Sequence, residues 1–368
     1  MKVDIITLHA VHNYGSVLQA FATQELLKQY GCEVKIINYI RENVRPENLM
    51  QTWSKGNPII KLIMWPTLKQ WKHVFTGFCM QNLNLTSQSY TTEADFEHYP
   101  LDADMYCTGS DQVWNSKWNR GIIYPLYLSF VPDGKYKFAF SASFGQDKLS
   151  QEEVDCTKKF ISQYNCISIR ESTAKKIVEE QYGYKNAVHL LDPTLAVTPE
   201  FWRKYETPRK IKVDYILIYN LNRSKEFDNY AVQLSKRLGL KLVRFCTRYD
   251  QFYRPGKSML IPEVFEFISL IDNAKYVLTD SFHATAFSMN MNIEPICVYP
   301  AEFGGRLDSF LKLVDSKQRH VVDYKDYDVI NRPVDFNVVN TILENERKKV
   351  NDFICDVLAE AQECLPKE

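Results

Sequence analysis

Short apolar runs alternate with amphipathic stretches along most of the chain, and no other feature of the sequence restricts the fold as strongly. This alternation is typical of α/β proteins with a mainly parallel sheet. At the start of the chain it predicts a strand over Val3–Leu8, a helix over Ser16–Tyr30 and a second strand over Val34–Tyr39. Further strands are predicted over Met105–Thr108, Lys137–Ser141, Ile167–Ile169, Val188–Leu191, Tyr215–Tyr219, Lys241–Phe245, Tyr276–Thr279 and Pro295–Val298.

The length of 368 residues predicts two domains. Pro199 and Pro208 interrupt the pattern, so we expect an N-terminal Rossmann-like domain over 1–198 and a C-terminal Rossmann-like domain over 199–368. Three of the six tryptophans lie in the segment 41–100, which departs from the alternation and is interpreted as a helical insertion in the first domain. Apolar residues at helical spacing predict a C-terminal helix that closes the second domain: Val350, Phe353, Ile354, Val357 and Leu358.

Composition excludes several classes of function. Lysine and arginine together number 45, as do aspartate and glutamate, so the molecule has no overall positive field for nucleic acid. None of the nine cysteines forms a CxxC pair, which argues against a disulfide framework and a zinc site. Met1–Thr7 reads as a strand that contains an acidic residue, so we expect no signal peptide, and no apolar run reaches the ~20 residues of a membrane helix. We therefore expect a soluble, cytoplasmic protein.

The loop between the first predicted strand and the first predicted helix contains Asn13, Gly15 and Ser16. Backbone N–H groups at the start of a helix favour an anion. Gly15 lets the backbone approach a ligand, and Ser16 can cap the helix. The loop lacks the GxGxxG pattern, so a dinucleotide is not indicated. The loop is either an anion site or an ordinary capped connection.

Two polar turns follow later strands and contain candidate sugar-binding residues. Asp111, Gln112 and Trp114 come after Met105–Thr108. Asp111 and Gln112 can bind sugar hydroxyls while Trp114 stacks on the ring. The alternative is a turn with a buried tryptophan. Ser143 lies in the similar turn after the next strand, where small polar residues can donate hydrogen bonds.

Charged residues follow two further strands, at the edge where ligands bind in open α/β sheets. Arg170 comes directly after Ile167–Ile169, and it either clamps a carboxylate or phosphate or pairs internally with Glu171. Asp192 follows the next strand. It is either a functional acid or a turn former before Pro193.

Two candidate anion-binding residues lie in the C-terminal half. Ser281 and His283 are found where the strand Tyr276–Thr279 passes into a helix. A helix N-terminus disfavours the imidazolium, so a charged His283 requires an anion or carboxylate beside it. The alternative is a structural histidine. The segment Phe303–Leu307 has a glycine pair before Arg306. It is either a mobile loop that brings the arginine to a ligand or an ordinary surface loop with an exposed arginine.

Together these motifs resemble the polysaccharide pyruvyl transferase family from Asn13 to about Leu311. The motifs that carry the resemblance are Asn13-Tyr14-Gly15-Ser16-Val17-Leu18-Gln19-Ala20, Gly109-Ser110-Asp111-Gln112-Val113-Trp114-Asn115, Ser168-Ile169-Arg170-Glu171, Leu191-Asp192-Pro193-Thr194, Asp280-Ser281-Phe282-His283 and Arg306-Leu307. The family resembles GT-B glycosyltransferases, in which two Rossmann-like domains with mainly parallel sheets face a cleft. Its members transfer the pyruvyl group of phosphoenolpyruvate to a sugar as a cyclic ketal. The resemblance therefore implies phosphoenolpyruvate as donor substrate, with no other cofactor and no metal.

The resemblance assigns Asp192 and His283 to acid–base catalysis and Arg170 and Arg306 to clamping the donor. Many members carry an arginine two residues before the histidine, where this chain has Ser281, and we expect Arg306 to supply the missing charge. The remaining donor-binding candidates are Ser281, Asn13, Gly15 and Ser16, and the acceptor-binding candidates are Asp111, Gln112, Trp114 and Ser143.

Two other functions are compatible with parts of this pattern. A GT-B glycosyltransferase with a nucleotide-sugar donor has the same fold, and it would bind UDP- or GDP-sugars in place of phosphoenolpyruvate. A non-catalytic carbohydrate-binding protein needs the aromatic residues but neither arginine clamp, and it would not bind phosphoenolpyruvate.

The expected partners are phosphoenolpyruvate and a sugar or oligosaccharide acceptor of a cell-surface polysaccharide, and no nucleic acid. The tryptophans and lysines of 41–100 also resemble a surface that contacts a membrane. Such a surface suits an acceptor carried on a lipid at the inner face of the membrane. The alternative is that these aromatic residues fill a core.

Overall fold

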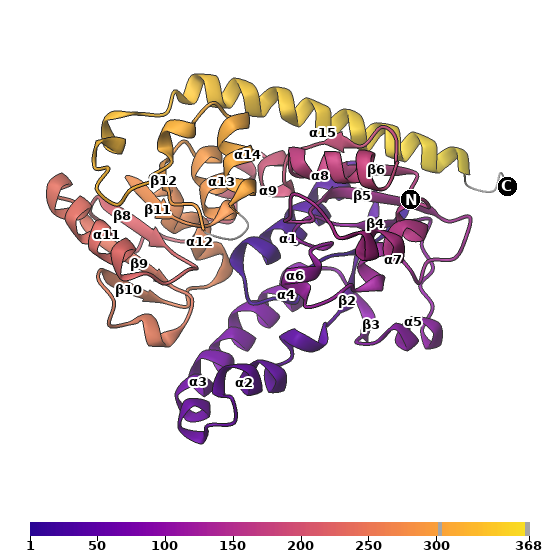
Figure 1. Cartoon of the computed structure of the whole chain (residues 1–368), viewed down its shortest axis with the longest axis horizontal. Coiled ribbons are helices and arrows are strands. Elements are labelled where there is room, and N and C mark those ends of the chain that lie inside the picture. The colour runs from indigo at the N-terminus through magenta and orange to yellow at the C-terminus, as the bar shows by residue number, and fades with distance from the viewer. Residues whose placement is uncertain (301–303, 365–368) are drawn as a thin grey trace. The chain divides into compact units, whose positions relative to one another are not determined.

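The computed structural model describes residues 1–300 and 304–364, and the chain divides into two compact units (Figure 1). Unit 1 consists of Met1–Lys61, Phe75–Ala196 and the chain from Glu346 onward, and unit 2 consists of Leu62–Val74 and Val197–Asn345. The division after Ala196 lies close to the boundary predicted after residue 198.

Two segments belong to a different unit from the one predicted. Residues 62–74, expected within an insertion of the first domain, are part of unit 2. The chain from Glu346 onward, expected to close the second domain, is part of unit 1. The helices α3 (Pro58–Trp71) and α15 (Phe336–Cys364) each run from one unit into the other. Sequence periodicity identifies such helices but carries no information about which core they cover.

Unit 1 is built on a seven-stranded sheet of order β3-β2-β1-β4-β5-β6-β7, in which all neighbouring strands are parallel. The inner strands β4 and β5 are buried at every residue, as expected for a parallel sheet covered on both faces. The strands are β1 (Lys2–Ile6), β2 (Glu33–Tyr39), β3 (Leu85–Tyr90), β4 (Met105–Thr108), β5 (Tyr136–Ala142), β6 (Cys166–Ile169) and β7 (Val188–His189).

The segment 41–100 is helical only in part, which corrects the prediction of a helical insertion. Its strand β3 pairs with β2 at the edge of the sheet. The sequence of β3, Leu-Thr-Ser-Gln-Ser-Tyr, is half exposed and has no apolar run. An edge strand needs less apolar surface than a central one, and the hydrophobic pattern therefore did not reveal it.

Helix α1 (Tyr14–Gln29) was predicted over Ser16–Tyr30, and it begins two residues earlier because Asn13, and not Ser16, is its N-cap. The side chain of Asn13 caps its N-terminus, and Gly31 follows its C-terminus with φ of 79°. The other helices of unit 1 are α2 (Pro46–Ser54), α4 (Gly77–Asn82), α5 (Glu93–His98), α6 (Ser116–Asn119), α7 (Gln151–Ile161), α8 (Ser172–Lys176) and α9 (Pro193–Ala196).

The C-terminal part of α15 packs on unit 1 through its predicted apolar stripe. Phe353 stacks on Phe140 of β5, with ring centroids 6.4 Å apart. Two hydrogen bonds flank this contact, from Tyr30 to Asn351 at 2.6 Å and from Tyr136 to Glu360 at 2.8 Å. The stripe is therefore a packing face of the first unit.

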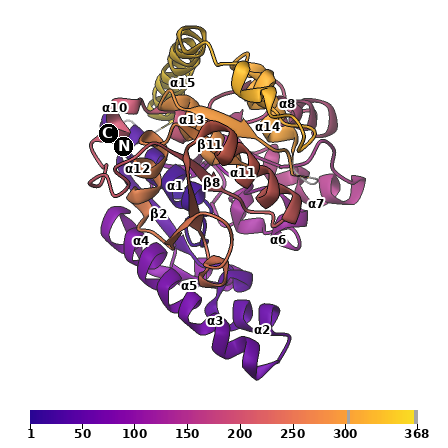
Figure 2. The same ribbon diagram turned by 90° about the vertical axis from the view of Figure 1, so that its left-hand side faces the viewer.

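Unit 2 contains a five-stranded parallel sheet of order β10-β9-β8-β11-β12, flanked by helices (Figure 2). Its strands are β8 (Tyr215–Tyr219), β9 (Lys241–Cys246), β10 (Lys257–Leu260), β11 (Tyr276–Thr279) and β12 (Glu294–Cys297). Its helices are α10 (Pro199–Arg203), α11 (Lys225–Leu238), α12 (Val264–Asp272), α13 (Phe282–Asn290) and α14 (Gly305–Leu313). Strand β10 was not predicted, and it too is a partly exposed edge strand.

Across residues 1–300 and 304–364, none of the helices combines the length and the apolar character that a membrane span requires.

Candidate active site

Arg170 is the centre of a buried charge network at the carboxyl end of the sheet in unit 1. Its Nη1 donates to Asp192 Oδ2 at 2.6 Å, and its Nη2 lies 3.4 Å from Asp111 Oδ1. Its Nε lies 3.9 Å from Glu171 Oε2. Burial acts to lower the pKa of the guanidinium, but these three carboxylates outweigh burial and raise it. Arg170 is therefore an internal cation with Asp192 as its main partner, and these contacts favour internal pairing over the expected donor clamp.

Both carboxylate oxygens of Asp192 are engaged. Oδ2 accepts from Arg170 and from Ser110 Oγ, the latter at 3.0 Å. Oδ1 accepts from the backbone N–H and the hydroxyl of Thr194 at 2.9 and 2.7 Å, which closes the turn at Pro193. A buried carboxylate with four donors is stabilised in its charged form and is poorly suited to move protons. These contacts favour the turn-forming alternative over the expected catalytic role.

The backbone is strained where two strands of this sheet meet the network. Asp111, just after β4, and Ser141, in β5, have φ values of 76° and 52°. Left-handed conformations are costly for residues other than glycine and concentrate at functional sites. Asp111 Oδ2 accepts a short hydrogen bond from Ser16 Oγ, and Ser141 Oγ donates to the carbonyl of Leu191 at 2.6 Å. The strained turns thus hold Asp111 between Ser16 and Arg170.

The three candidates of the first loop lie at the start of α1. Asn13 Oδ1 accepts from the backbone N–H of Ser16 at 3.3 Å, and Gly15 is buried in the first turn. The hydrogen bond from Ser16 to Asp111 brings this helix end against the charge network. These contacts are those of an ordinary loop that ends in a helix N-cap. Donor binding by these residues stays a prediction.

Ser143 and Gln112, predicted to bind the acceptor, are held inside the turns after β5 and β4. Ser143 Oγ donates to Glu171 Oε1 at 2.7 Å, and Gly145 N donates to the same oxygen at 3.2 Å. Gln112 Oε1 accepts from Asn115 Nδ2 at 2.6 Å. Gly145 has φ of 59°, and a Cβ there would overlap the amides of Gln112 and Asn115. Both candidates shape these turns, which corrects the direct contact with sugar expected of Ser143 and Gln112.

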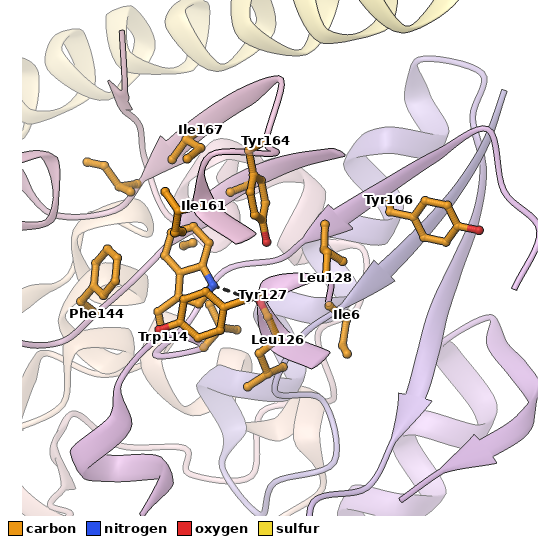
Figure 3. Close-up of a cluster of buried hydrophobic side chains, with 14 of the residues drawn as sticks. Ile6, Tyr106, Trp114, Leu126, Tyr127, Leu128, Phe144, Ile161, Tyr164 and Ile167 are labelled. Atoms are coloured by element: carbon orange, nitrogen blue, oxygen red, sulfur yellow. Dashed lines mark hydrogen bonds between the residues drawn. The ribbon is translucent and has the colours of Figure 1, made fainter. Parts of the chain in front are cut away.

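Trp114 lies in the hydrophobic core of unit 1 and not at a binding surface (Figure 3). Only 1% of the residue is exposed, and its Nε1 donates to the carbonyl of Leu126 at 3.0 Å. Its ring stacks on Tyr127 and also contacts Phe144 and Tyr164. The expectation that Trp114 stacks on a sugar is therefore wrong, because the apolar indole gains more from burial beside these rings.

In unit 2, His283 lies in the first turn of α13, which begins directly after β11. Ser281 is the N-cap, and its Oγ accepts from the backbone N–H of Ala284 at 3.4 Å. The His283 ring meets the ring of Phe282 edge-on, with centroids 5.3 Å apart. The sequence thus predicted the position of this histidine at a strand end and a helix N-terminus.

Arg306 lies in the first turn of α14 and is half-buried. The helix begins at Gly305, so Arg306 is carried by a helix and not by the mobile loop expected; Phe303 lies outside the described residues. Phe282 of α13 packs against Phe310 of α14, with ring centroids 5.8 Å apart. The start of α13 therefore lies against α14 within the same unit.

Asp280 ties the start of α13 to the loop after β8. Its carboxylate accepts from the backbone N–H groups of Leu221 and Asn222, both at 2.7 Å, and from the side chains of Asn222 and Asn220. Burial raises the pKa of Asp280, and these hydrogen bonds oppose the rise. Asp280 thereby fixes the backbone that carries Ser281.

Sequence reasoning overlooked Arg41, a second arginine near a strand end. Arg41 is buried, and its Nη1 donates a short hydrogen bond to Asn119 Oδ1. It comes two residues after β2, much as Arg170 comes directly after β6. The same strand-end argument would have found it, but the segment beginning at residue 41 had been interpreted as an insertion.

The family model described as polysaccharide pyruvyl transferase matches residues 13–302. The chain belongs to this family. The match includes the strand ends of unit 1 and the Ser281–His283 motif of this pyruvyl transferase family member, and it ends before Arg306. No protein of curated function matches the sequence.

Solved structures similar to this pyruvyl transferase family member include two UDP-N-acetylglucosamine 2-epimerases. The enzyme from Rickettsia bellii is 11% identical with a TM-score of 0.54, covering 99% of this chain and 97% of its own. The enzyme from Methanocaldococcus jannaschii, solved with UDP-GlcNAc and UDP, is 12% identical with a TM-score of 0.51, covering 94% of each chain. This likeness concerns the fold alone, and with the two parallel sheets it confirms the predicted GT-B-like class.

Proposed function

We propose that this protein transfers the pyruvyl group of phosphoenolpyruvate to two hydroxyls of a sugar and forms a cyclic ketal. The observation that carries the proposal is the family match over residues 13–302. The acceptor that we propose is a sugar of a cell-surface polysaccharide or of its lipid-linked precursor. Phosphoenolpyruvate is the donor substrate, and no further cofactor enters the proposal.

The first turns of α13 and α14 support a donor site in unit 2. Phosphoenolpyruvate carries a carboxylate and a phosphate, which arginine side chains and helix N-termini bind well. His283 and Arg306 each lie where a helix dipole disfavours a cation, and a bound anion offsets that cost. We therefore assign donor binding to His283, Arg306 and the capping residue Ser281.

Pyruvyl transfer requires one acid and one base. The acid protonates the methylene carbon of phosphoenolpyruvate, which makes C2 electrophilic. One sugar hydroxyl adds to C2 and gives up its proton, the bond from C2 to the phosphate oxygen breaks, and a second hydroxyl closes the ketal and gives up its own. One hydroxyl proton restores the acid and the other leaves with inorganic phosphate. We propose His283 for one of these transfers, because Asp192 is fully engaged in its ion pair.

The decisive experiment incubates the protein with phosphoenolpyruvate and a panel of sugar acceptors and measures the products by mass spectrometry. The proposal predicts a pyruvyl ketal together with released phosphate. Parallel reactions contain UDP- or GDP-sugars in place of phosphoenolpyruvate. Consumption of a nucleotide-sugar with no product from phosphoenolpyruvate would show a glycosyltransferase, and binding of sugar with neither reaction would show a non-catalytic protein.

Arg306→Ala is expected to weaken phosphoenolpyruvate binding by ~2 kcal/mol, or about 30-fold in Kd, because it removes one partner of a desolvated charge pair. Isothermal calorimetry measures this effect. The matched control is Arg237→Ala, on an exposed face of α11 in the same unit, which should leave the Kd unchanged. Equal donor affinity of wild type and Arg306→Ala would show that Arg306 is an ordinary surface residue.

Helix α3 supports the proposal of a lipid-linked acceptor. Its large apolar side chains are exposed, with relative exposures of 76% for Leu62 and 57% for Trp65. The helix has no acidic residue and carries Lys61 and Lys69, both exposed. Apolar side chains next to lysines match the surface of an anionic bilayer. We therefore propose that α3 contacts the inner face of the membrane.

The double substitution Leu62→Glu and Trp65→Glu is expected to reduce binding to anionic vesicles about 10-fold or more, since it removes apolar side chains that enter the interface. Co-sedimentation at low salt measures the bound fraction. Val322→Glu, at an exposed apolar residue outside α3, serves as the matched control and should bind like wild type. A wild-type protein that stays in the supernatant would contradict the membrane contact.

A further inference from the structure

Unit 1 contains a cavity of about 500 Å³ at the ends of β2 and β3, outside every site considered above. Its walls come from η1 (Glu42–Val44), α2 and the end of α6. Among the lining residues, Arg41 and Arg120 are cationic and Glu42 is anionic, while Asn48 and Asn119 contribute amides. The volume lies within the range of small-molecule sites. The cavity thus has the size and polarity for a small polar ligand with negative charge.

Arg41 is held in one position at the wall of this cavity. Only 4% of the residue is exposed. The guanidinium carbon lies 4.7 Å from the ring centroid of Trp118, and Nη1 donates to Asn119. Nη2 is buried and has no hydrogen-bond partner in the part of the chain that the structure describes. The orientation of this cation is therefore set before any ligand arrives, which lowers the entropic cost of binding.

The charge of Arg41 has no direct counter-ion within residues 1–300 and 304–364. The carboxylate that acts on it most strongly is Asp111, which already pairs with Arg170 and accepts from Ser16. Burial lowers the pKa of Arg41 to about 10, so the guanidinium is still charged at neutral pH. Buried charges in proteins are normally paired. An unpaired, preoriented guanidinium at a cavity wall indicates that a ligand supplies the anion.

The cavity is joined to the turn that follows β4. Asn119 Nδ2 donates to the carbonyl of Val113 at 3.0 Å, and it also lies 3.4 Å from the carbonyl of Gln112. That turn carries Asp111 and was predicted to bind the acceptor. The cavity therefore lies beside the turn whose side chains were predicted to bind the acceptor.

We propose that this cavity binds the anionic group of a saccharide, a phosphate or a carboxylate, through Arg41 and Arg120. The amide of Asn48 binds a sugar hydroxyl, while Asn119 holds Arg41 in place. Planar guanidinium groups form paired hydrogen bonds with both kinds of anion, and an amide can donate and accept at hydroxyls. Only the identification of this saccharide as the acceptor rests on the proposed function.

Isothermal calorimetry without phosphoenolpyruvate tests the site with four probes: glucose 1-phosphate, glucuronate, neutral glucose and inorganic phosphate. We expect glucose 1-phosphate or glucuronate to bind more tightly than glucose or phosphate alone. The comparison of the first two separates a phosphate from a carboxylate as the anion. Equal binding of neutral glucose, or no binding of either anionic sugar, would overturn the proposal.

Two variants test the cavity, one at a buried residue and one at an exposed residue, so that a loss of binding can be told apart from a loss of folding. Arg41→Gln should weaken binding of the anionic sugar about 10-fold or more, since it loses charged hydrogen bonds. Because Arg41 is buried, a second variant, Thr52→Trp, fills the cavity from an exposed position of α2 and should weaken binding as well. Arg237→Gln in unit 2 is the control. Wild-type affinity in folded Thr52→Trp would place the ligand elsewhere.

The outcome is separable from that of the proposed function. Binding of phosphoenolpyruvate to the Arg41→Gln protein should remain as in wild type, because the residues to which we assign donor binding, Ser281, His283 and Arg306, lie in unit 2. If an anionic sugar binds in the cavity but no pyruvyl product forms, the cavity assignment stands and the proposed reaction fails. If pyruvyl transfer occurs with unchanged kcat and KM in both cavity variants, the saccharide bound in the cavity is not the acceptor, and the reaction stands.

Discussion

Asp192→Asn is expected to lower the free energy of unfolding by about 3 to 5 kcal/mol, the cost of removing one partner from a buried ion pair. The oxygen that accepts from Thr194 can be kept, but the new amide nitrogen then faces Arg170 Nη1, which can only donate. Arg170 would lose its main counter-charge while remaining fully buried. Urea unfolding of wild type and variant measures the change.

The same substitution at an exposed ion pair separates the effect of burial from the effect of removing a charge. Asp102→Asn removes a carboxylate from an exposed pair, 3.5 Å from Lys135 Nζ, and should change stability far less. Turnover per folded molecule is expected to stay within 10-fold of wild type in both variants. A stable, folded Asp192→Asn protein with turnover reduced about 100-fold would contradict the structural role and restore the catalytic role expected from the sequence.

His283→Gln is expected to lower kcat about 100-fold or more, because a positioned acid or base contributes at least that factor. Glutamine keeps a polar side chain of similar size in the first turn of α13, but it cannot exchange a proton near neutral pH. The fall should appear in kcat for ketal formation, with a smaller change in the Kd for phosphoenolpyruvate. The pH dependence of kcat/KM should also lose one limb.

The control for this prediction is His98→Gln, at an exposed histidine whose Nδ1 bonds to the carbonyl of Ala94. It should leave kcat unchanged. If His283 only fills space beside Phe282, its substitution should lower thermal stability, with activity falling in proportion to the folded fraction. A folded His283→Gln protein with normal kcat would exclude proton transfer by His283.

The two largest predictions concern different units. In unit 1, three carboxylates surround the buried guanidinium of Arg170. Unit 2 supplies His283 and Arg306 in helix first turns, where an anion is favoured. Stability should therefore respond most to changes in the first set, and donor binding and turnover to changes in the second.

Local patterns in the sequence were enough to predict the central strands, the helix α1 and the polar residues at strand ends. The cap of α1 was expected at Ser16, and the structure places it at Asn13. Strands β4, β8 and β11 were predicted with their observed bounds because they are short apolar runs between polar turns. The edge strands β3 and β10 were missed because partly exposed strands lack that pattern.

Only the tertiary structure decided what the strand-end residues contact. The sequence placed Arg170, Asp192 and Trp114 at the correct edge of the sheet, since strand direction follows from the α/β alternation. It could not show that Asp192 would neutralise Arg170, or that Trp114 would turn into the core beside Tyr127. Those outcomes depend on side chains brought together from distant segments, and the free energies of burial and pairing are properties of that assembled environment. The same reason explains Arg41: that it lacks a counter-ion among the described residues becomes evident only when its neighbours are in place.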